Sequence, residues 1–267
     1  MRHLRGKRAL ITGGAGGIGR ALASALVAEG AEVIVADVDG QAATEFAAAL
    51  VGAGHVAAAL RLDVTDIDSI AAARSTLLES AGPPDILFNN AGVVSGGPFA
   101  RVPLTEHRRT IAVNLDGVMA VTHAFLPDLV ARPEAHIVNV VSASAFLALP
   151  FGASYAASKW GALGFSESLR HELRALGHGH VKVTAVCPAY VDTGMFAGAK
   201  APPLTRFLAP EALAAATVRA VRRDTRVLRV PWPVQLTRLA AIVPTRVFDI
   251  VGRLFGIDTS MRDWTGQ

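Results

Sequence analysis

Residues 8–29 read RALITGGAGGIGRALASALVAE, and the order of apolar, glycine-rich and again apolar segments in this stretch decides the fold. Residues 8–12 contain the apolar run Ala-Leu-Ile and favour a β-strand, whereas residues 18–29 place apolar side chains at helical spacing. The residues between them, from Gly13 to Gly19, are mostly glycine and predict a tight turn. A strand that turns directly into a helix points the free N–H groups of the helix N-terminus at the carboxyl end of the strand.

The glycine turn has the features of a dinucleotide-binding turn. Gly13 permits the tight bend, Gly17 lets the backbone approach a pyrophosphate, and Gly19 lets the helix pack closely against the strand. Asp37 ends the next predicted strand, where a carboxylate accepts hydrogen bonds from an adenosine ribose and repels a 2′-phosphate. Because no Arg or Lys stands near Asp37 in the sequence, we expect NAD rather than NADP. The alternative is that Asp37 only caps the turn into the following helix.

The remainder of the chain repeats the alternation of strands and helices. Short apolar runs predict strands, and longer amphipathic stretches between them predict helices. The further predicted strands are 31–37, 55–64, 85–92, 135–142, 181–188 and 226–232, and the further predicted helices are 41–51, 66–80, 105–130, 155–176 and 211–223. This series predicts an α/β fold, with one doubly wound domain over residues 1–267 and a parallel sheet of about seven strands.

Composition and charge exclude several functional classes. Cys187 is the only cysteine, so the chain has no intramolecular disulfide and nothing requires an oxidising compartment. The longest uncharged run, 137–158, contains proline, glycines and serines, which predict a strand and a loop rather than a membrane span. The histidines lack metal-ligand spacing, and no basic patch with interleaved aromatics predicts nucleic-acid binding. We therefore expect a cytoplasmic protein that binds neither metal nor nucleic acid.

Further motifs follow the glycine turn in a fixed order. The turn has the spacing T-G-x-x-x-G-x-G from Thr12, and it is followed by Asn-Asn-Ala-Gly at residues 89–92, by Asn114 and Ser142, and by the pair Tyr155 and Lys159. Over residues 5–195 this set resembles the short-chain dehydrogenase/reductase family, and the tail more faintly resembles its retinol and hydroxysteroid branch. The resemblance implies a Rossmann fold and the catalytic residues Asn114, Ser142, Tyr155 and Lys159. It implies that the cofactor is held by Gly13, Gly17, Ile18, Gly19, Asp37, Asp63, Val64, Asn90, Ala91, Gly92, Tyr155, Lys159, Pro188, Val191 and Thr193.

Tyr155 and Lys159 stand one helical turn apart, so a helix places both on one face. Oxidation of an alcohol by hydride transfer requires removal of the hydroxyl proton, and a free tyrosine with a pKa of about 10 is a poor base at neutral pH. We expect the Lys159 ammonium, together with the positive nicotinamide of bound NAD, to stabilise the phenolate. Tyr155 then acts as general base in oxidation and as general acid in reduction.

The resemblance assigns roles to the other polar residues. It implies that Lys159 also holds the nicotinamide ribose and that Ser142 orients the substrate oxygen, with Ser144 a weaker candidate. It implies that Asn114 holds a water between Lys159 and solvent, whereas the alternative is an amide bonded to local backbone. Residues 89–90 are expected to fix the loop around the adenosine ribose.

Two regions outside the repeat concern the substrate and partners. The lid 190–210 is rich in Gly and Pro and carries apolar side chains, which favours a small hydrophobic alcohol or carbonyl substrate. In the C-terminal tail 231–267, two apolar helices with interspersed arginines are predicted over 234–255. They cover the substrate cleft, enter a subunit interface, or make a weak peripheral contact with a membrane surface. Apolar positions on helices 105–130 and 155–176 predict a homodimer or homotetramer.

Together these patterns predict an NAD-dependent oxidoreductase that interconverts a hydrophobic alcohol and its carbonyl. The alternative is a non-catalytic NAD-binding sensor or scaffold on the same fold. The joint presence of Asn114, Ser142, Tyr155 and Lys159 favours the enzyme, because a sensor would not need all four.

Overall fold

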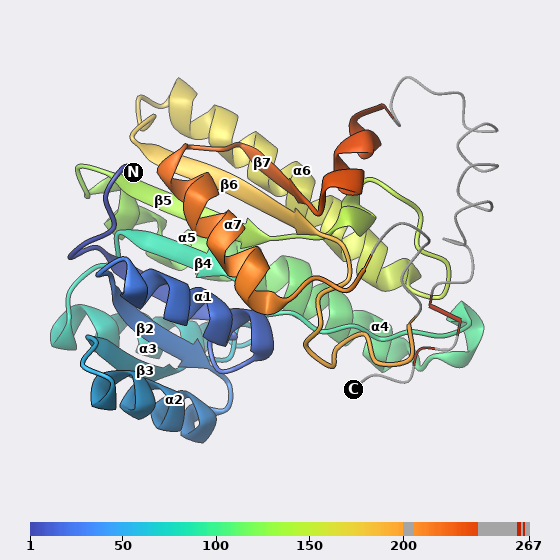
Figure 1. Cartoon of the computed structure of the whole chain (residues 1–267), viewed down its shortest axis with the longest axis horizontal. Coiled ribbons are helices and arrows are strands. Elements are labelled where there is room, and N and C mark those ends of the chain that lie inside the picture. Colours follow the sequence, from blue (N-terminus) through green and yellow to red (C-terminus); the bar gives the residue numbers. More distant parts are fainter. Residues whose placement is uncertain (200–205, 240–260, 263, 265–267) are drawn as a thin grey trace.

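The computed structural model describes residues 1–199, 206–239, 261–262 and 264. Within these ranges the chain forms a seven-stranded parallel sheet in the order β3-β2-β1-β4-β5-β6-β7, with helices on both faces (Figure 1). The strands are β1 (Arg8–Thr12), β2 (Glu32–Asp37), β3 (Ala57–Arg61), β4 (Ile86–Asn89), β5 (Ala135–Val140), β6 (Val181–Pro188) and β7 (Val227–Val230). The predicted doubly wound α/β fold is confirmed.

Two helical layers cover the sheet, because each strand alternates its side chains between two apolar faces. One face is covered by α1 (Gly17–Ala28), α2 (Gly40–Gly52) and α7 (Pro210–Arg222), and the other by α3 (Ile67–Ser80), α5 (Gly117–Val130) and α6 (Ala153–Ala175) (Figure 1). In β2, Val33 and Val35 belong to the first apolar core, and Ile34 and Ala36 belong to the second. Burial on both faces explains why the strands read as continuous apolar runs.

The strand order places the site at the carboxyl edge of the sheet, where the parallel strands end. β1 lies between β2 and β4, so the direction of winding reverses beside it. In open parallel sheets such a reversal leaves a crevice outside the carboxyl ends of the strands, where ligands bind. The loops that leave this edge carry the glycine turn, residues 89–92, Ser142 and Thr193.

The helix predicted over 105–130 is divided, which the sequence did not indicate. α4 (Leu104–Ile111) passes into the π-helical segment η2 (Ala112–Asp116) before α5 begins. Asn114 lies at the centre of η2, is fully buried, and directs its amide to Val93 of another loop. Wider turns of this kind inside helices are frequent at functional sites.

The lid and the tail lie partly outside the described residues. Residues 190–199 and 206–210 of the lid are described, and a bridge between Val191 and Leu208 joins its two ends. Of the apolar helices predicted over 234–255, residues 234–239 fall in the 3₁₀ helix η4 (Trp232–Leu239), and the rest lies outside the described ranges. Further 3₁₀ helices are η1 (Phe99–Arg101) and η3 (Ala143–Ala145). Within the part of the chain that is described, no helix is long and apolar enough to cross a membrane.

His136 is a fully buried histidine in β5, and its surroundings determine its charge state. Its Nε2 lies 2.8 Å from Thr184 Oγ1, while the Thr184 hydroxyl donates its hydrogen to the carbonyl of Thr225. Nε2 therefore carries the proton of the ring and donates it to Thr184. Burial lowers the pKa of His136 to about 3, and the positive charges of the N-terminus and Lys182 act in the same direction.

Acid should therefore destabilise the fold through His136. Between about pH 6.5 and about pH 3 the unfolded chain binds a proton at this residue and the folded protein does not, so stability rises with pH in this range. Below about pH 6.5 the free energy of unfolding, measured in urea, should fall by up to about 1.4 kcal/mol per pH unit. His136→Gln should remove this fall. The exposed His123 gives the matched control, because His123→Gln should keep the wild-type pH dependence. A wild-type pH dependence in His136→Gln would show that His136 does not cause it.

Candidate active site

The glycine turn after β1 brings backbone closer to backbone than a side chain would allow. Gly13 has a φ of +62°, in the left-handed region that favours glycine. A Cβ on Gly19 would lie 2.2 Å from the carbonyl oxygen of Gly13, so the first turn of α1 packs directly onto the glycine turn. Thr12 fastens this turn to β4, because its hydroxyl donates to the carbonyl of Phe88 and accepts from the N–H groups of residues 90–91.

The turn fits the pyrophosphate of a dinucleotide. α1 begins after Gly16 without a side-chain cap, so its first N–H groups are available to an anion. A Cβ on Gly17 would lie 2.7 Å from Thr193 Cγ2, which places Thr193 against the start of α1. Asn90 donates to the two carbonyls that open the turn, and its buried Oδ1 has no hydrogen-bond partner among the described residues. The donors and the close backbone approach therefore suit NAD or NADP at this edge of the sheet.

Asp37 lies beside the glycine turn, as predicted, and the backbone holds its carboxylate. Its Oδ2 accepts from Ala15 N at 3.0 Å, and its Oδ1 accepts from Asp39 N at 3.1 Å. Lone pairs on both oxygens remain for the hydroxyls of a ribose. Asp37 also accepts from Asp39 N in the turn that leads into α2, whereas the side chain of Asp39 caps the helix itself.

Arg61 and Arg20, both distant from Asp37 in the sequence, lie next to Asp37 in the sheet and at the glycine turn, respectively. Arg61 is its register partner in β3 and therefore points from the same face of the sheet. Arg20 donates from Nε to Ala15 O at 2.6 Å, and its guanidinium lies 4.7 Å from the centre of the Phe46 ring. The expectation that Asp37 has no basic residue nearby is wrong in space, because strand pairing and the glycine turn join parts of the chain that the local sequence does not.

Asn89 and Asn90 point to opposite faces of the sheet, because successive side chains of a strand alternate. Asn90 faces the glycine turn, whereas Asn89 donates to Thr122 and Asn139 in the buried layer beneath α5. The prediction that both fix the loop around the ribose is therefore wrong for Asn89.

The remaining predicted cofactor residues divide between the edge of the sheet and the core. Asp63 accepts hydrogen bonds from the N–H and hydroxyl of Thr65, which lower its pKa. Val64 packs against the start of α5, where a Cβ on Gly117 would lie 2.8 Å from its Cγ2. The last three lie near the glycine turn or lid: Ile18 and Val191 pack in the first apolar core, and Pro188 ends β6.

Tyr155, Lys159 and Ser142 come together at the carboxyl end of β5. α6 presents Tyr155 and Lys159 on one face, and the Lys159 Nζ lies 5.6 Å from the centre of the Tyr155 ring. The Ser142 side chain neighbours the Tyr155 hydroxyl and acts to lower its pKa. Ser142 Oγ also accepts from Ser144 N at 3.1 Å, whereas Ser144 Oγ has no partner among the described residues. This geometry favours Ser142 over Ser144 as the partner of Tyr155.

Burial favours the neutral form of each member of the tyrosine and lysine pair. It raises the pKa of Tyr155 to about 12, although the Ser142 side chain acts in the opposite direction. It lowers the pKa of Lys159 to about 8, and the Lys159 Nζ donates to Val140 O at 2.9 Å. Burial thus disfavours the phenolate and the ammonium together, and the stabilisation of the phenolate by Lys159 with bound NAD stays a prediction. Burial also raises the pKa of the Cys187 thiol to about 12, which makes it unreactive.

Asn114 connects this pair to the loop after β4. Its Oδ1 accepts from Val93 N, and its Nδ2 donates to Val93 O and to Ser158 Oγ. Gly92 lies against both Asn114 and Lys159, since a Cβ there would be 3.3 Å from Asn114 Oδ1 and 3.7 Å from Lys159 Nζ. The amide thus binds backbone in a distant loop rather than in its own helix, and its link to a water stays a prediction.

Apolar side chains line the substrate side of Tyr155. Tyr155 is 5% exposed, and the cluster around it contains Val94, Tyr190, Phe196, Met261 and Trp264. The lid residues in this cluster were expected from the sequence. Met261 and Trp264 were missed, because no local pattern relates the end of the tail to Tyr155.

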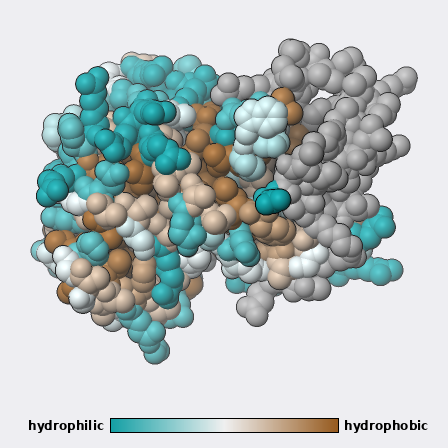
Figure 2. Space-filling view, in the orientation of Figure 1, coloured by the Kyte–Doolittle hydropathy of each residue, from teal (hydrophilic) through white to brown (hydrophobic). Residues whose placement is uncertain are grey.

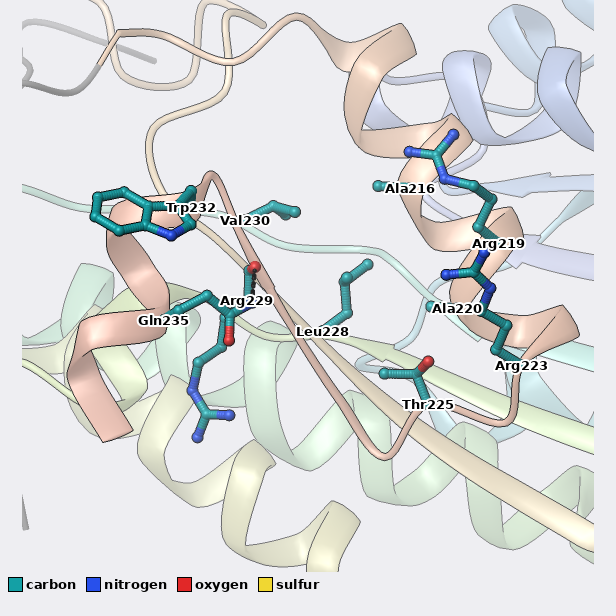
Figure 3. Close-up of a pocket in the computed structure, with 10 residues that line it drawn as sticks. All are labelled: Ala216, Arg219, Ala220, Arg223, Thr225, Leu228, Arg229, Val230, Trp232 and Gln235. Carbon is teal, nitrogen blue, oxygen red and sulfur yellow. Dashed lines mark hydrogen bonds between the residues drawn. The ribbon is translucent and has the colours of Figure 1, made fainter. Parts of the chain in front are cut away.

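A cavity of about 330 Å³ opens elsewhere, between α7, β7 and η4. Apolar residues gather near the centre of the face seen in Figure 2, where Figure 1 places α7 and β7. In Figure 3, Arg219 and Arg223 lie on one side of the cavity and Trp232 and Gln235 on the other, with Leu228 between them. None of the predicted catalytic or cofactor residues lines this cavity, so it is separate from the site at the carboxyl edge.

Known proteins that are similar in sequence and structure include dehydrogenases. The sequence pattern of the family described as short chain dehydrogenase matches residues 7–203. The 1-deoxy-11-beta-hydroxypentalenate dehydrogenase of Streptomyces exfoliatus is 39% identical over 75% of this chain and 73% of its own length. Retinol dehydrogenase 10-A of Danio rerio is 34% identical over 77% of this chain and 62% of its own length. A short chain dehydrogenase/reductase from Burkholderia phymatum, solved in complex with NAD, has a TM-score of 0.81 at 27% identity and covers 100% of this chain and 99% of its own.

The close packing of the glycine turn predicts different outcomes at two neighbouring glycines. Gly19→Ala should lower the free energy of unfolding by about 3 kcal/mol, because its Cβ would meet a backbone oxygen at 2.2 Å. Gly16→Ala is the matched control and should change it by less than about 1 kcal/mol, because the nearest atom to its Cβ would be 3.5 Å away. Urea denaturation measures both, and equal losses would contradict the packing argument.

Proposed function

The chain belongs to the short-chain dehydrogenase family of NAD(P)-dependent oxidoreductases, and from this premise we propose that it interconverts a hydrophobic alcohol and its carbonyl by hydride transfer. In this proposal Tyr155 is the proton acceptor and donor, and NAD is the preferred cofactor. The observation that carries the proposal is the grouping of Tyr155 with Ser142 and Lys159, with the Lys159 Nζ 5.6 Å from the centre of the Tyr155 ring on the same face of α6.

The four predicted catalytic residues have separate tasks in this proposal. Ser142 donates a hydrogen bond to the substrate oxygen and holds it near the Tyr155 hydroxyl. Tyr155 takes the hydroxyl proton in oxidation and returns it in reduction. Lys159 holds the nicotinamide ribose and stabilises the phenolate. Asn114 fixes the loop that packs on Lys159, and it holds the water through which the proton reaches solvent.

A buried tyrosine needs additional positive charge before it can act as a base. Burial raises the pKa of Tyr155 to about 12, so the phenolate is scarce at neutral pH. Oxidised NAD, when bound, supplies both the hydride acceptor and a positive charge. Each unit by which this charge and Lys159 lower the tyrosine pKa corresponds to about 1.4 kcal/mol. The chain thus keeps Tyr155 protonated until the oxidised cofactor is in place.

The enclosure around Tyr155 supports a hydrophobic substrate. Its lining side chains Val94, Phe196 and Met261 are buried and offer no polar group to a hydrophilic alcohol. The Danio rerio relative is named for retinol, an apolar alcohol, which supports the same substrate class here.

The preference for NAD follows from Asp37. Its carboxylate lies beside the glycine turn, where it can bind ribose hydroxyls and would repel a 2′-phosphate. The Burkholderia phymatum neighbour was solved with NAD, which is consistent with this preference. Arg61 neighbours Asp37 in register and Arg20 binds Ala15 O of the glycine turn, so in this proposal the preference depends on the charge of Asp37.

We also propose a homodimer or homotetramer that pairs the α4–α6 side of the molecule. Met119 in α5, Trp160 in α6 and Leu176 at the end of α6 expose large apolar side chains. Burial of these side chains against a second copy would remove them from water. The buried Cys187, the one cysteine of the chain, fits a location in the reducing cytoplasm.

Tyr155→Phe should abolish turnover and leave the fold and NADH affinity intact, because only the proton-transferring hydroxyl is lost. We expect kcat to fall by about 100-fold or more with NAD and a panel of secondary alcohols, followed at the NADH absorbance. Ser144→Ala is the matched control, since it removes a neighbouring buried hydroxyl that has no partner among the described residues. This control should keep most of the wild-type kcat.

Two outcomes would contradict the proposal. A Tyr155→Phe variant that keeps a tenth or more of the wild-type kcat, about 1.4 kcal/mol or less of barrier, would exclude Tyr155 as the base. A wild-type protein that binds NADH but oxidises no alcohol and reduces no carbonyl would favour the sensor or scaffold.

Asp37→Ala should move the cofactor preference towards NADP, because it removes the negative charge and leaves Arg20 and Arg61 in place. The ratio of the dissociation constants for NADPH and NADH, measured by fluorescence titration, should fall by about tenfold or more, which corresponds to about 1.4 kcal/mol. Addition of Arg61→Ala should reverse part of this shift. A wild-type kcat/KM that favours NADP would refute the role given to Asp37.

A further inference from the structure

Trp264 joins the end of the tail to two other segments. Its indole Nε1 donates to the carbonyl of Met195 in the lid at 3.0 Å. Its ring lies on Gly96, where a Cβ would be 2.8 Å from ring atom Cε3 and 2.9 Å from Cδ2. Glycine at this position lets the indole approach the backbone, so the loop after β4, the lid and the tail meet at one point.

This junction holds apolar side chains against Tyr155. The backbone N–H of Trp264 donates to the carbonyl of Met261 at 3.2 Å, and Met261 is fully buried in the cluster around Tyr155. From the lid, the ring of Phe196 meets the Tyr155 ring edge-on, with 5.9 Å between their centres. Side chains of the lid and of the tail thus pack together on the substrate side of the tyrosine.

These contacts bear on which alcohols reach Tyr155, and this step rests on the proposed function. A substrate at the Tyr155 hydroxyl has to replace contacts that Phe196 and Met261 make in the closed cluster. A bulky apolar molecule restores buried apolar contacts of the same kind, whereas a short alcohol leaves part of this surface uncovered.

We propose that Trp264, Gly96 and Met261 determine substrate specificity. Trp264 seated on Gly96 fixes the end of the tail to the lid, and Met261 and Phe196 then form an apolar wall that selects bulky apolar alcohols over short ones. Met261 and Trp264 therefore belong to the substrate cleft. The sequence alone left the tail at the substrate cleft, in a subunit interface or against a membrane surface.

Kinetics with alcohols of different length test the wall. In Trp264→Ala the KM for 2-decanol should rise about tenfold at nearly constant kcat, while the KM for 2-propanol stays the same. Gly96→Ala should act in the same direction, because the added methyl group displaces the indole. The NADH dissociation constant should not change in either variant. Trp232→Ala is the matched control, because Trp232 is exposed in η4, and it should keep the wild-type values.

A second readout does not depend on turnover. The chain has three tryptophans, so Trp160→Phe combined with Trp232→Phe leaves Trp264 alone. Acrylamide should quench this protein less than a counterpart that keeps only the exposed Trp232. In the presence of NADH, 2-decanol should change the quenching of Trp264 about twofold or more, and 2-propanol should not.

Three outcomes would overturn the inference: wild-type selectivity in Trp264→Ala, equal quenching of the two single-tryptophan proteins, or no response of Trp264 to 2-decanol. The proposed function fails by a different result, which is turnover retained in Tyr155→Phe. The two failures are therefore distinguishable, because the fluorescence of Trp264 reports on the wall even in a protein that cannot transfer a hydride.

Discussion

The approach of Gly19 to the carbonyl of Gly13 is the contact on which the site depends. A Cβ at Gly19 would lie 2.2 Å from that oxygen, so α1 begins as close to β1 as two backbones allow. This fixes the N-terminus of α1 at the point where the strand order reverses, and with it the place where an anion can bind. Asn90 ties the loop after β4 to the turn, and Gly92 in the same loop packs on Lys159. The glycine turn and the loop after β4 thus position both the cofactor edge and the pair Tyr155 and Lys159.

Tyr155 and Lys159 are buried together, although burial disfavours the charged form of each. Burial moves the pKa of Tyr155 up and that of Lys159 down, and each shift disfavours the charged form needed for catalysis. A sequence optimised only for stability without a cofactor would not bury two ionisable side chains beside each other. It becomes useful when a positively charged cofactor enters beside it, because the charge then acts at short range in a site with little water. Under the proposed function, Tyr155 is therefore available as a base only when a hydride acceptor is present.

The sequence predicted the parts of the site that depend on near neighbours along the chain. The spacing of Gly13, Gly17 and Gly19 indicates the turn, and the four-residue spacing of Tyr155 and Lys159 places them on one helix face. It could not predict contacts made by the pairing of strands or by packing. Arg61 stands beside Asp37 only because β3 pairs with β2 in that register. The π-helical segment around Asn114 depends on hydrogen bonds to Val93, which belongs to a loop 21 residues earlier.

The residues at the cofactor edge and the residues of the apolar cluster around Tyr155 come partly from different regions of the chain. The family pattern matches residues 7–203, which include the glycine turn, Asp37 and the pair Tyr155 and Lys159. Met261 and Trp264 lie beyond it and reach Tyr155 through the lid and Gly96. In the proposed arrangement a substitution at Met261 alters the substrate wall and leaves the strands of the sheet and the glycine turn in place. The proposed hydride transfer and choice of alcohol can therefore vary independently, since the first depends on residues positioned by the sheet and the second on the lid and tail.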